Sequence, residues 1–225
     1  MLISEKHNFI FIHVWKVAGT SVTKALEKYA YNPDKYIPKL ILKKAGVKSD
    51  PINQIVETAD RYGVVPLYAG LRRHARAIQV KQRLTAQKYD KFYTFAFVRN
   101  PWDWEVSFYH YVLSRKNHAQ HERVKAMGSF EKYLEWKVNN IDNDFVLQKD
   151  FVTDESGKVI VDFIGRYENL SEDFQTICDK LKLDTSLPHA NKSQRKTYQK
   201  YYNPHTKKLL EECYQEDINF FDYTF

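Results

Sequence analysis

The chain of 225 residues has a mass of 26.8 kDa and carries 35 Lys and Arg against 28 Asp and Glu, a formal net charge of +7. Hydrophobic residues make up 43% and aromatic residues 15% of it, with only 7 Gly and 7 Pro, which excludes a disordered, collagen-like or low-complexity chain. No apolar run reaches the roughly 18 residues that a membrane span needs, and the first residues lack the pattern of a signal peptide. We expect one soluble, cytoplasmic domain over residues 1–225.

The basic residues are concentrated in two stretches that contain no Asp or Glu. One stretch lies between Asp60 and Asp90, and the other lies between Asp184 and Glu211. Such stretches predict a positively charged cleft and an anionic partner.

Two segments have the pattern of a buried strand that leads into a helix. Residues 9–13, FIFIH, precede a glycine-containing turn and a helix over residues 21–30, in which apolar residues recur at spacings of three and four. Residues 92–98, FYTFAFV, end at Arg-Asn-Pro, and a helix over 102–115 follows. Repeated strand-loop-helix units predict an α/β fold with a central sheet.

The other segments are predicted from helix periodicity and turn residues. Four prolines interrupt residues 31–70, which we expect to form short helices and loops. The remaining expected elements are a helix over 75–87, a surface loop over 116–128, a helix over 130–138, a strand over 159–164, a helix over 171–181 capped by Ser171, a helix over 204–215 and an aromatic tail that closes over the core.

The turn after the first strand, VWKVAGTS, has the composition of an anion-binding loop. A helix N-terminus has unpaired backbone N–H groups and a partial positive charge, so it binds phosphate or sulfate. Gly19 lets the backbone approach the anion, Thr20 and Ser21 add hydroxyl donors, and Lys16 adds a cation. The lysine precedes the glycine, so the turn is not a Walker A loop. The alternative is an ordinary helix cap with a surface lysine.

A second motif, VRNPWDWEVSFYHY, follows the second predicted strand. Ligands of open α/β sheets bind beyond the carboxyl ends of strands, so Arg99 is expected in the same crevice as the first turn. Ser107 lies two helical turns later, and a guanidinium and a hydroxyl at this spacing suit one phosphate group. The alternative is a core ion pair for Arg99 and a solvent-facing Ser107.

These two motifs, followed by GRYENL, LPHANKSQRKTYQKYY and DINFFDYTF, resemble the sulfotransferases that use 3′-phosphoadenosine-5′-phosphosulfate (PAPS). The resemblance is greatest to the carbohydrate O-sulfotransferase branch and its compact bacterial relatives. It implies an α/β fold with a P-loop-like central parallel sheet, flanked by helices on both faces. It also implies transfer of a sulfuryl group from PAPS to a hydroxyl acceptor, expected to be a glycan, with no metal, nucleic acid or membrane span involved.

The resemblance also implies a role for particular residues. It assigns the 5′-phosphosulfate to Lys16, Gly19, Thr20 and Ser21, and the 3′-phosphate to Arg99 and Ser107. Tyr167 matches a family tyrosine beside the adenine, and Arg195 lies in a late loop that closes over the nucleotide. Two residues depart from the family pattern: Trp15 replaces the usual proline before the lysine, and Trp104 replaces a second arginine found in many members.

Sulfuryl transfer needs in-line attack, a base for the hydroxyl proton and positive charge at the leaving oxygen. Lys16 suits the last role, and His74 is the expected base, since similar relatives carry a histidine in this part of the chain and a neutral imidazole accepts a proton near pH 7. Three acidic residues, each more typical of a solvated helix, are rival bases: Glu57, Asp60 and Glu105. Three basic residues near His74 are expected to attract an anionic acceptor: Arg72, Arg73 and Arg76.

Three histidines have simpler interpretations. His13, at the end of the first strand, is expected to be a satisfied core residue. His118 and His121 offer too few ligands for a metal site.

Two other functions remain open at this point. A nucleotide-dependent phosphotransferase would need magnesium-binding carboxylates and a Walker lysine, which the motifs do not supply. A non-catalytic polyanion or nucleic-acid binding domain would use the two basic stretches but would leave the motifs around Lys16 and Arg99 unexplained.

Overall fold

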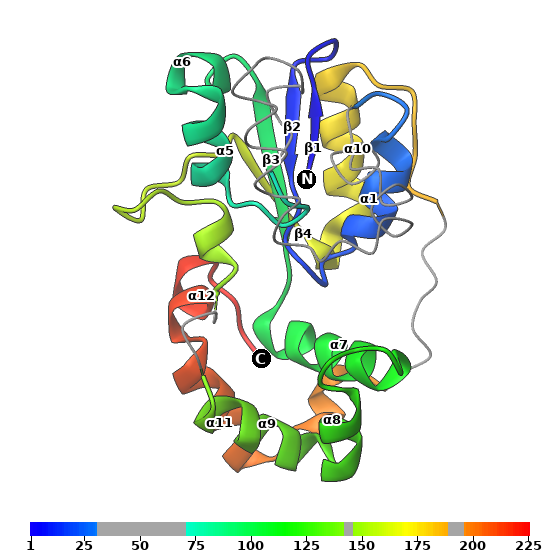
Figure 1. The fold of residues 1–225 in the computed structure, drawn as a ribbon, viewed down its shortest axis with the longest axis vertical. Coiled ribbons are helices and arrows are strands. Elements are labelled where there is room, and N and C mark those ends of the chain that lie inside the picture. The colour runs from blue at the N-terminus through cyan, green and yellow to red at the C-terminus, as the bar shows by residue number, and fades with distance from the viewer. Residues whose placement is uncertain (31–70, 142–145, 189–195) are drawn as a thin grey trace, which may run out of the picture.

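The computed structural model describes residues 1–30, 71–141, 146–188 and 196–225, and in these residues the strands form one four-stranded sheet (Figure 1). The strands are β1 (Leu2–Ser4), β2 (Phe9–Ile12), β3 (Tyr93–Val98) and β4 (Phe163–Arg166), in the order β1-β2-β3-β4. The β2–β3 and β3–β4 pairs are parallel, whereas β1 pairs with β2 antiparallel.

The sheet is therefore mixed, and the prediction of a purely parallel sheet is wrong at its edge. An antiparallel pair needs only a tight turn, whereas parallel strands need a long crossover connection. Residues 5–8 supply such a turn, with Asn8 in the left-handed region at φ 51°. The strand predicted over residues 9–13 and the one predicted over 92–98 are both confirmed.

Helices cover both faces of the sheet, as predicted (Figure 1). One face carries α1 (Gly19–Leu26) and α10 (Leu170–Leu181), and the other carries α5 (Ala77–Leu84) and α6 (Ala86–Tyr89). All residues of β2 are buried, as are all residues of β3 after Tyr93. A continuous apolar strand such as FIFI is typical of a sheet that is covered on both sides.

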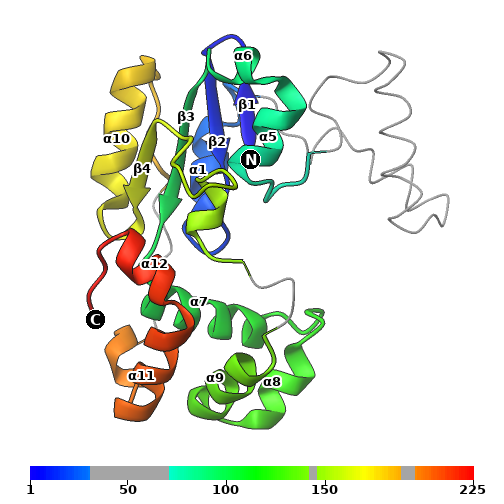
Figure 2. The same ribbon diagram turned by 90° about the vertical axis from the view of Figure 1, so that its left-hand side faces the viewer.

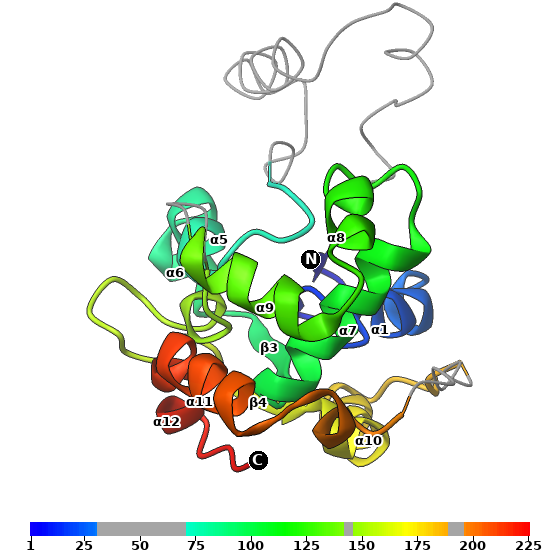
Figure 3. The same cartoon turned by 90° about the horizontal axis from the view of Figure 1, so that it is seen from below.

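A layer of helices lies beyond the carboxyl ends of β2 and β3 (Figure 2). It consists of α7 (Pro101–Ser114), α8 (His121–Met127), α9 (Phe130–Asn139), α11 (Pro204–Cys213) and α12 (Gln215–Phe220). Seen from below, α8 and α9 lie beside α7, and α11 packs against α9 (Figure 3). Three short 3₁₀ helices complete the described elements: Lys149–Phe151, Tyr167–Asn169 and Tyr198–Tyr201.

The prediction of a surface loop over residues 116–128 is wrong, because this segment contains α8. Its sequence, HERVKAM, buries only His121 and Val124, so its apolar stripe is too weak to stand out. The helix ends at Gly128, which takes the left-handed conformation at φ 72°, the usual conformation of a helix-terminating glycine.

Several predicted boundaries also differ. The helix predicted over 75–87 is divided into α5 and α6 at Thr85, whose φ is 71°. The helix predicted over 204–215 ends at Cys213, and α12 follows it. The helix predicted over 171–181 starts at Leu170, so Ser171 lies inside it and does not cap it.

The strand predicted over 159–164 is displaced. Val159 forms only an isolated bridge with Thr153, and regular pairing with β3 begins at Phe163. Between them, the Asp162 carboxylate accepts hydrogen bonds from the backbone N–H and the hydroxyl of Thr94, at 2.7 and 2.8 Å. The backbone N–H of Asp162 also donates to the carbonyl of Thr94 at 2.8 Å, so Asp162 is bonded to β3 just before regular pairing begins.

The C-terminal tail packs as expected, with Phe221 and Tyr223 buried and the ring of Phe225 5.5 Å from that of Trp102. No helix within the described part of the chain is long and apolar enough to cross a membrane. The short helices and loops predicted for residues 31–70 lie outside the described residues.

Candidate active site

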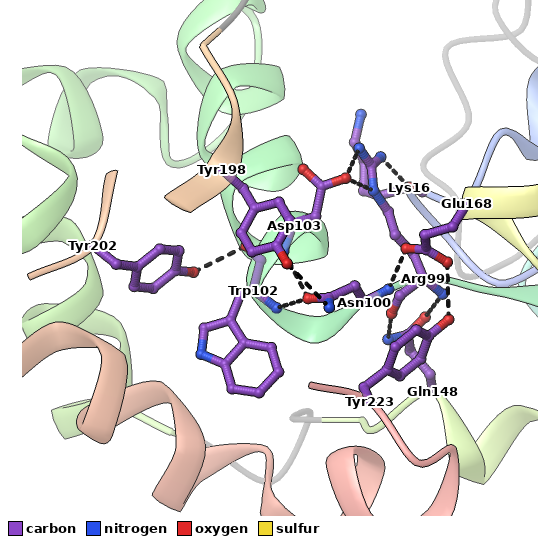
Figure 4. Close-up of polar contacts among 10 residues, drawn as sticks. All are labelled: Lys16, Arg99, Asn100, Trp102, Asp103, Gln148, Glu168, Tyr198, Tyr202 and Tyr223. Carbon is purple, nitrogen blue, oxygen red and sulfur yellow. Dashed lines mark hydrogen bonds and ion pairs between the residues drawn. The ribbon is translucent and has the colours of Figure 1, made fainter. Parts of the chain in front are cut away.

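The predicted site residues converge at the carboxyl ends of the three parallel strands. The loop of Lys16 follows β2, Arg99 follows β3 directly, and Tyr167 follows β4 directly. The guanidinium carbon of Arg99 lies 3.7 Å from the ring centroid of Tyr167. Nη1 of Arg99 donates to the carbonyl of Lys16 at 3.1 Å (Figure 4). Arg99 thus links the ends of all three strands.

Asp103 is the ion-pair partner of Arg99. Its Oδ2 accepts hydrogen bonds from Nε and Nη2 of Arg99, at 2.8 and 2.6 Å. The core ion pair, which is the alternative expected for Arg99, is therefore present, and Arg99 is only 4% exposed. The sequence signal for Asp103 is its position four residues after Arg99.

The backbone of Arg99 is clamped by the side chain of Gln148. Gln148 Oε1 accepts from the N–H of Arg99 at 2.9 Å, and Nε2 donates to its carbonyl at 2.8 Å. Gln148 is held in turn by Asp217, whose carboxylate accepts the backbone N–H groups of Gln148 and Lys149 at 2.8 and 2.9 Å. Burial raises the pKa of Asp217 to about 6 despite these bonds. No local motif points to Gln148, and Asp217 is the first residue of the segment DINFFDYTF, to which no role was assigned.

Asn100 connects the second motif to the C-terminal tail. Its Oδ1 accepts the N–H groups of Trp102 and Asp103 and so caps α7, while its Nδ2 donates to the carbonyl of Thr224 at 2.8 Å. Its own N–H donates to Glu168 at 2.8 Å (Figure 4). Glu168 therefore braces the backbone at the start of α7. These bonds fix the direction in which α7 leaves β3.

The loop between β2 and α1 is tightly curled. Lys16 and Ala18 both take φ 62°, which is uncommon for residues with a side chain. The Ala18 carbonyl accepts the N–H groups of Ser21 and Val22 at 2.8 and 3.2 Å, and the helix starts at Gly19. Thr20 is exposed, and Ser21 is half-buried.

Gly19 is required by its contact with His13. A Cβ at position 19 would lie 1.8 Å from Nε2 of His13. His13 is buried, stacks on Phe11 and meets the ring of His74 edge-on. Burial, together with the positive N-terminus, His74 and Arg73, lowers the pKa of His13 to about 2. The expectation that His13 is a core residue is confirmed by its burial.

His74 is oriented by the end of β2. Its Nδ1 lies 2.8 Å from the carbonyl oxygen of His13. A carbonyl can only accept, so Nδ1 carries the hydrogen, and the lone pair of the neutral ring is on Nε2. His74 lines a cavity of about 310 Å³ together with Trp15, Arg72 and Arg76. This is the arrangement that a general base needs.

Arg73 differs from Arg72 and Arg76 because it does not line the cavity of His74. Its side chain is exposed. Its carbonyl accepts a hydrogen bond from the amine of Met1. The structure therefore brings Arg72 and Arg76 to His74, but not Arg73.

The two residues that depart from the family pattern contact each other. Trp104 Nε1 donates to the carbonyl of Trp15 at 2.7 Å, and the two rings stack at 5.9 Å with an angle of 15° between their planes. Trp104 thus holds the loop between β2 and α1 at Trp15, the position where the family usually has a proline.

The ammonium of Lys16 lies 4.2 Å from the ring centroid of Tyr111 on α7. Ser107 is half-buried on the same helix. Arg195 and two of the rival bases, Glu57 and Asp60, lie outside the described residues.

Glu105 is not a solvated helix charge. It is fully buried, and its carboxylate accepts hydrogen bonds from the hydroxyls of Tyr133 and Tyr214 and from Lys137 Nζ, the last two at 2.7 and 2.6 Å. Burial and the nearby Glu105 raise the pKa of both tyrosines. Glu105 therefore links helices of this layer through the three hydrogen bonds that its carboxylate accepts.

Within the described ranges no group of three or more His, Cys, Asp or Glu side chains is placed to hold a metal ion. His121 is buried, with Nδ1 3.0 Å from the carbonyl of Val112. Nδ1 of His118 accepts the N–H of Gln120 at 3.2 Å.

Ligands of open α/β sheets bind beyond the carboxyl ends of the parallel strands, where this chain has Lys16 and Arg99. The model of the sulfotransferase family matches residues 1–224, and the chain belongs to that family. It is also 31% identical over 119 residues to an uncharacterised protein of Archaeoglobus fulgidus, an alignment that covers 49% of this chain and 85% of the relative. No solved structure matches significantly.

Proposed function

We propose that the protein transfers the sulfuryl group of PAPS to a hydroxyl of a carbohydrate acceptor, with His74 as the base. Membership of the sulfotransferase family supports sulfuryl transfer in general. The observation that carries the finer proposal is the link through Arg99 between the Lys16 loop and Tyr167, beside the cavity of His74.

The donor would bind across the ends of the strands. The curled loop at Lys16 and Ala18 precedes the N-terminus of α1, whose first N–H groups have no partner within the helix and favour an anion. Gly19, Thr20 and Ser21 would add backbone and hydroxyl donors to the 5′-phosphosulfate.

The 3′-phosphate would bind at the second motif. The guanidinium of Arg99 has five N–H donors, of which Asp103 and the Lys16 carbonyl use three. The remaining donors of Arg99 and the Ser107 hydroxyl would hold the phosphate, Tyr167 would lie beside the adenine, and Arg195 would close over the nucleotide.

In the reaction the acceptor oxygen attacks sulfur in line with the bond to the phosphate oxygen. An S–O bond to the acceptor forms as the S–O bond to the phosphate breaks, and the electron pair of the broken bond stays on the phosphate oxygen. His74 Nε2 takes the hydroxyl proton, and the Lys16 ammonium balances the charge on the leaving phosphate. Arg72 and Arg76 would attract an acidic acceptor to the cavity of His74.

The test is transfer of radiolabelled sulfate from PAPS to a panel of glycans. The wild-type protein should label at least one glycan, and Lys16→Ala should nearly abolish labelling. Lys24→Ala, which removes an exposed cation from the last turn of α1, is the matched control and should retain labelling. If the panel stays unlabelled while simpler hydroxyl compounds are sulfated, the carbohydrate part of the proposal is wrong.

A further inference from the structure

A second cavity, of about 560 Å³, lies between the loop that follows β2 and the helices α7, α8 and α9. Its walls carry the indole rings of Trp15, Trp104 and Trp136. The volume is that of a small-molecule site, and flat aromatic faces suit a ring that stacks on them. The side-chain amides of Gln120 and Asn140 also line the cavity and suit hydrogen bonds to hydroxyl groups.

Trp15 connects this indole-lined cavity to the cavity of His74. Trp15 and Val146 line both. The ring centroid of Trp15 lies 6.0 Å from that of His74 and 5.9 Å from that of Trp104. Because Trp15 also precedes Lys16 directly, a ring bound in the indole-lined cavity would lie beside the proposed base and the proposed sulfate loop.

Two cations line the cavity, and their surroundings differ. Lys137 Nζ lies 2.6 Å from the buried carboxylate of Glu105, so its charge is already balanced. Arg123, on α8, is exposed, and its guanidinium carbon lies 5.3 Å from the ring centroid of Trp136. Among the residues that the structure describes, no carboxylate pairs with Arg123. Arg123 is therefore the cation at this cavity that an anionic ligand can engage.

We propose that the indole-lined cavity is the acceptor subsite, and that Arg123 selects acceptors with an anionic group on the ring that bears the hydroxyl. This inference rests on the proposed function. The acceptor ring stacks on the indoles, its anionic group bonds to the planar guanidinium, and its hydroxyl faces His74. The required chemistry is a six-membered ring with a hydroxyl and a carboxylate or sulfate, which acidic sugars and phenolic acids share.

The test is a comparison of charged and neutral ligands by ligand-observed NMR. Methyl glucuronide and methyl glucoside form a sugar pair that differs in one carboxylate, and 4-hydroxybenzoate and phenol form an aromatic pair. Each ligand is titrated into the wild-type protein, Arg123→Ala and Lys125→Ala. The last variant removes an exposed cation from the same helix outside the cavity and serves as the control.

We expect the charged member of at least one pair to bind about 10-fold more tightly than its neutral partner, since a hydrogen bond to a charged group has about this effect. The preference should persist in Lys125→Ala and disappear in Arg123→Ala. A preference in the sugar pair assigns the site to acidic sugars, and one in the aromatic pair assigns it to phenolic acids. The absence of any charge preference, or its persistence in Arg123→Ala, would overturn the inference.

Binding of the desulfonated donor, adenosine 3′,5′-bisphosphate (PAP), is measured on the same samples by calorimetry. If the wild-type protein binds PAP but shows no charge preference, or if the preference persists in Arg123→Ala, only the acceptor subsite is contradicted. Failure of the wild-type protein to bind PAP contradicts the proposed function, whatever the NMR titrations show.

Discussion

Replacing Gly19 by alanine tests the contact that joins the start of α1 to the end of β2. The added Cβ would lie 1.8 Å from Nε2, 2.1 Å from Cδ2 and 2.7 Å from Cε1 of His13, whereas real Cβ contacts are essentially never shorter than 3.0 Å. Either the imidazole or the helix must therefore move.

The imidazole has little room to move. His13 is 5% exposed, and its ring lies 5.5 Å from that of Phe11 and 4.6 Å from that of His74. Overpacking a filled site costs about 1–3 kcal/mol, and each kcal/mol lowers the Tm of a chain of this size by about 2–4 °C. Since the His13 carbonyl orients His74, the same shift would disturb the proposed base.

A double-mutant cycle followed by thermal unfolding isolates this effect. Gly19→Ala is measured in the wild-type protein and in His13→Ala, which vacates the space that the Cβ needs. The substitution should cost at least about 1 kcal/mol less in the His13→Ala background, because contacting residues are energetically coupled. An equal cost in both backgrounds, or no cost in the wild type, would refute the steric reasoning.

Three further variants test other parts of the account. Trp104→Phe keeps a ring but removes the 2.7 Å hydrogen bond to the Trp15 carbonyl, so calorimetry should show PAP binding weakened by about 5-fold, and unchanged affinity would show that this bond does not hold the loop. His74→Ala should lower turnover by about 10²–10⁴-fold with PAP affinity preserved, and wild-type turnover would remove His74 from the mechanism. Asp217 has a folded-state pKa raised from 3.8 to about 6, so the folded state retains its proton where the unfolded state has released it, and stability should fall by about 2 kcal/mol as pH rises from 4 to 6. Denaturant unfolding of Asp217→Asn should lack this decline, and an identical pH profile would contradict the assignment.

The sequence predicted the elements whose signal is local. The continuous apolar runs at residues 9–13 and 92–98 identify buried strands, and each is followed by a turn that must lie at the carboxyl end of its strand. This logic placed Lys16 and Arg99 at one edge of the sheet, where the structure has them. It failed at α8, whose polar sequence buries only two residues, and at β1, which has three residues.

The contacts that hold the site could not be predicted, because they join residues far apart in the chain. Gln148 contacts the backbone of Arg99 only after the chain has passed through α7, α8 and α9. The hydrogen bond between Trp104 and the Trp15 carbonyl likewise depends on how α7 packs against the loop. The sequence identifies these residues, but their contact partners are determined by the tertiary packing.

The most direct test of the central claim is a calorimetric titration with PAP, with AMP and ATP as controls and no added magnesium. The account predicts binding in the micromolar range or tighter that depends on the 3′-phosphate and is weakened in Arg99→Ala. No binding of PAP, or a preference for ATP, would contradict the assignment of the Lys16 loop and Arg99 to a PAPS site.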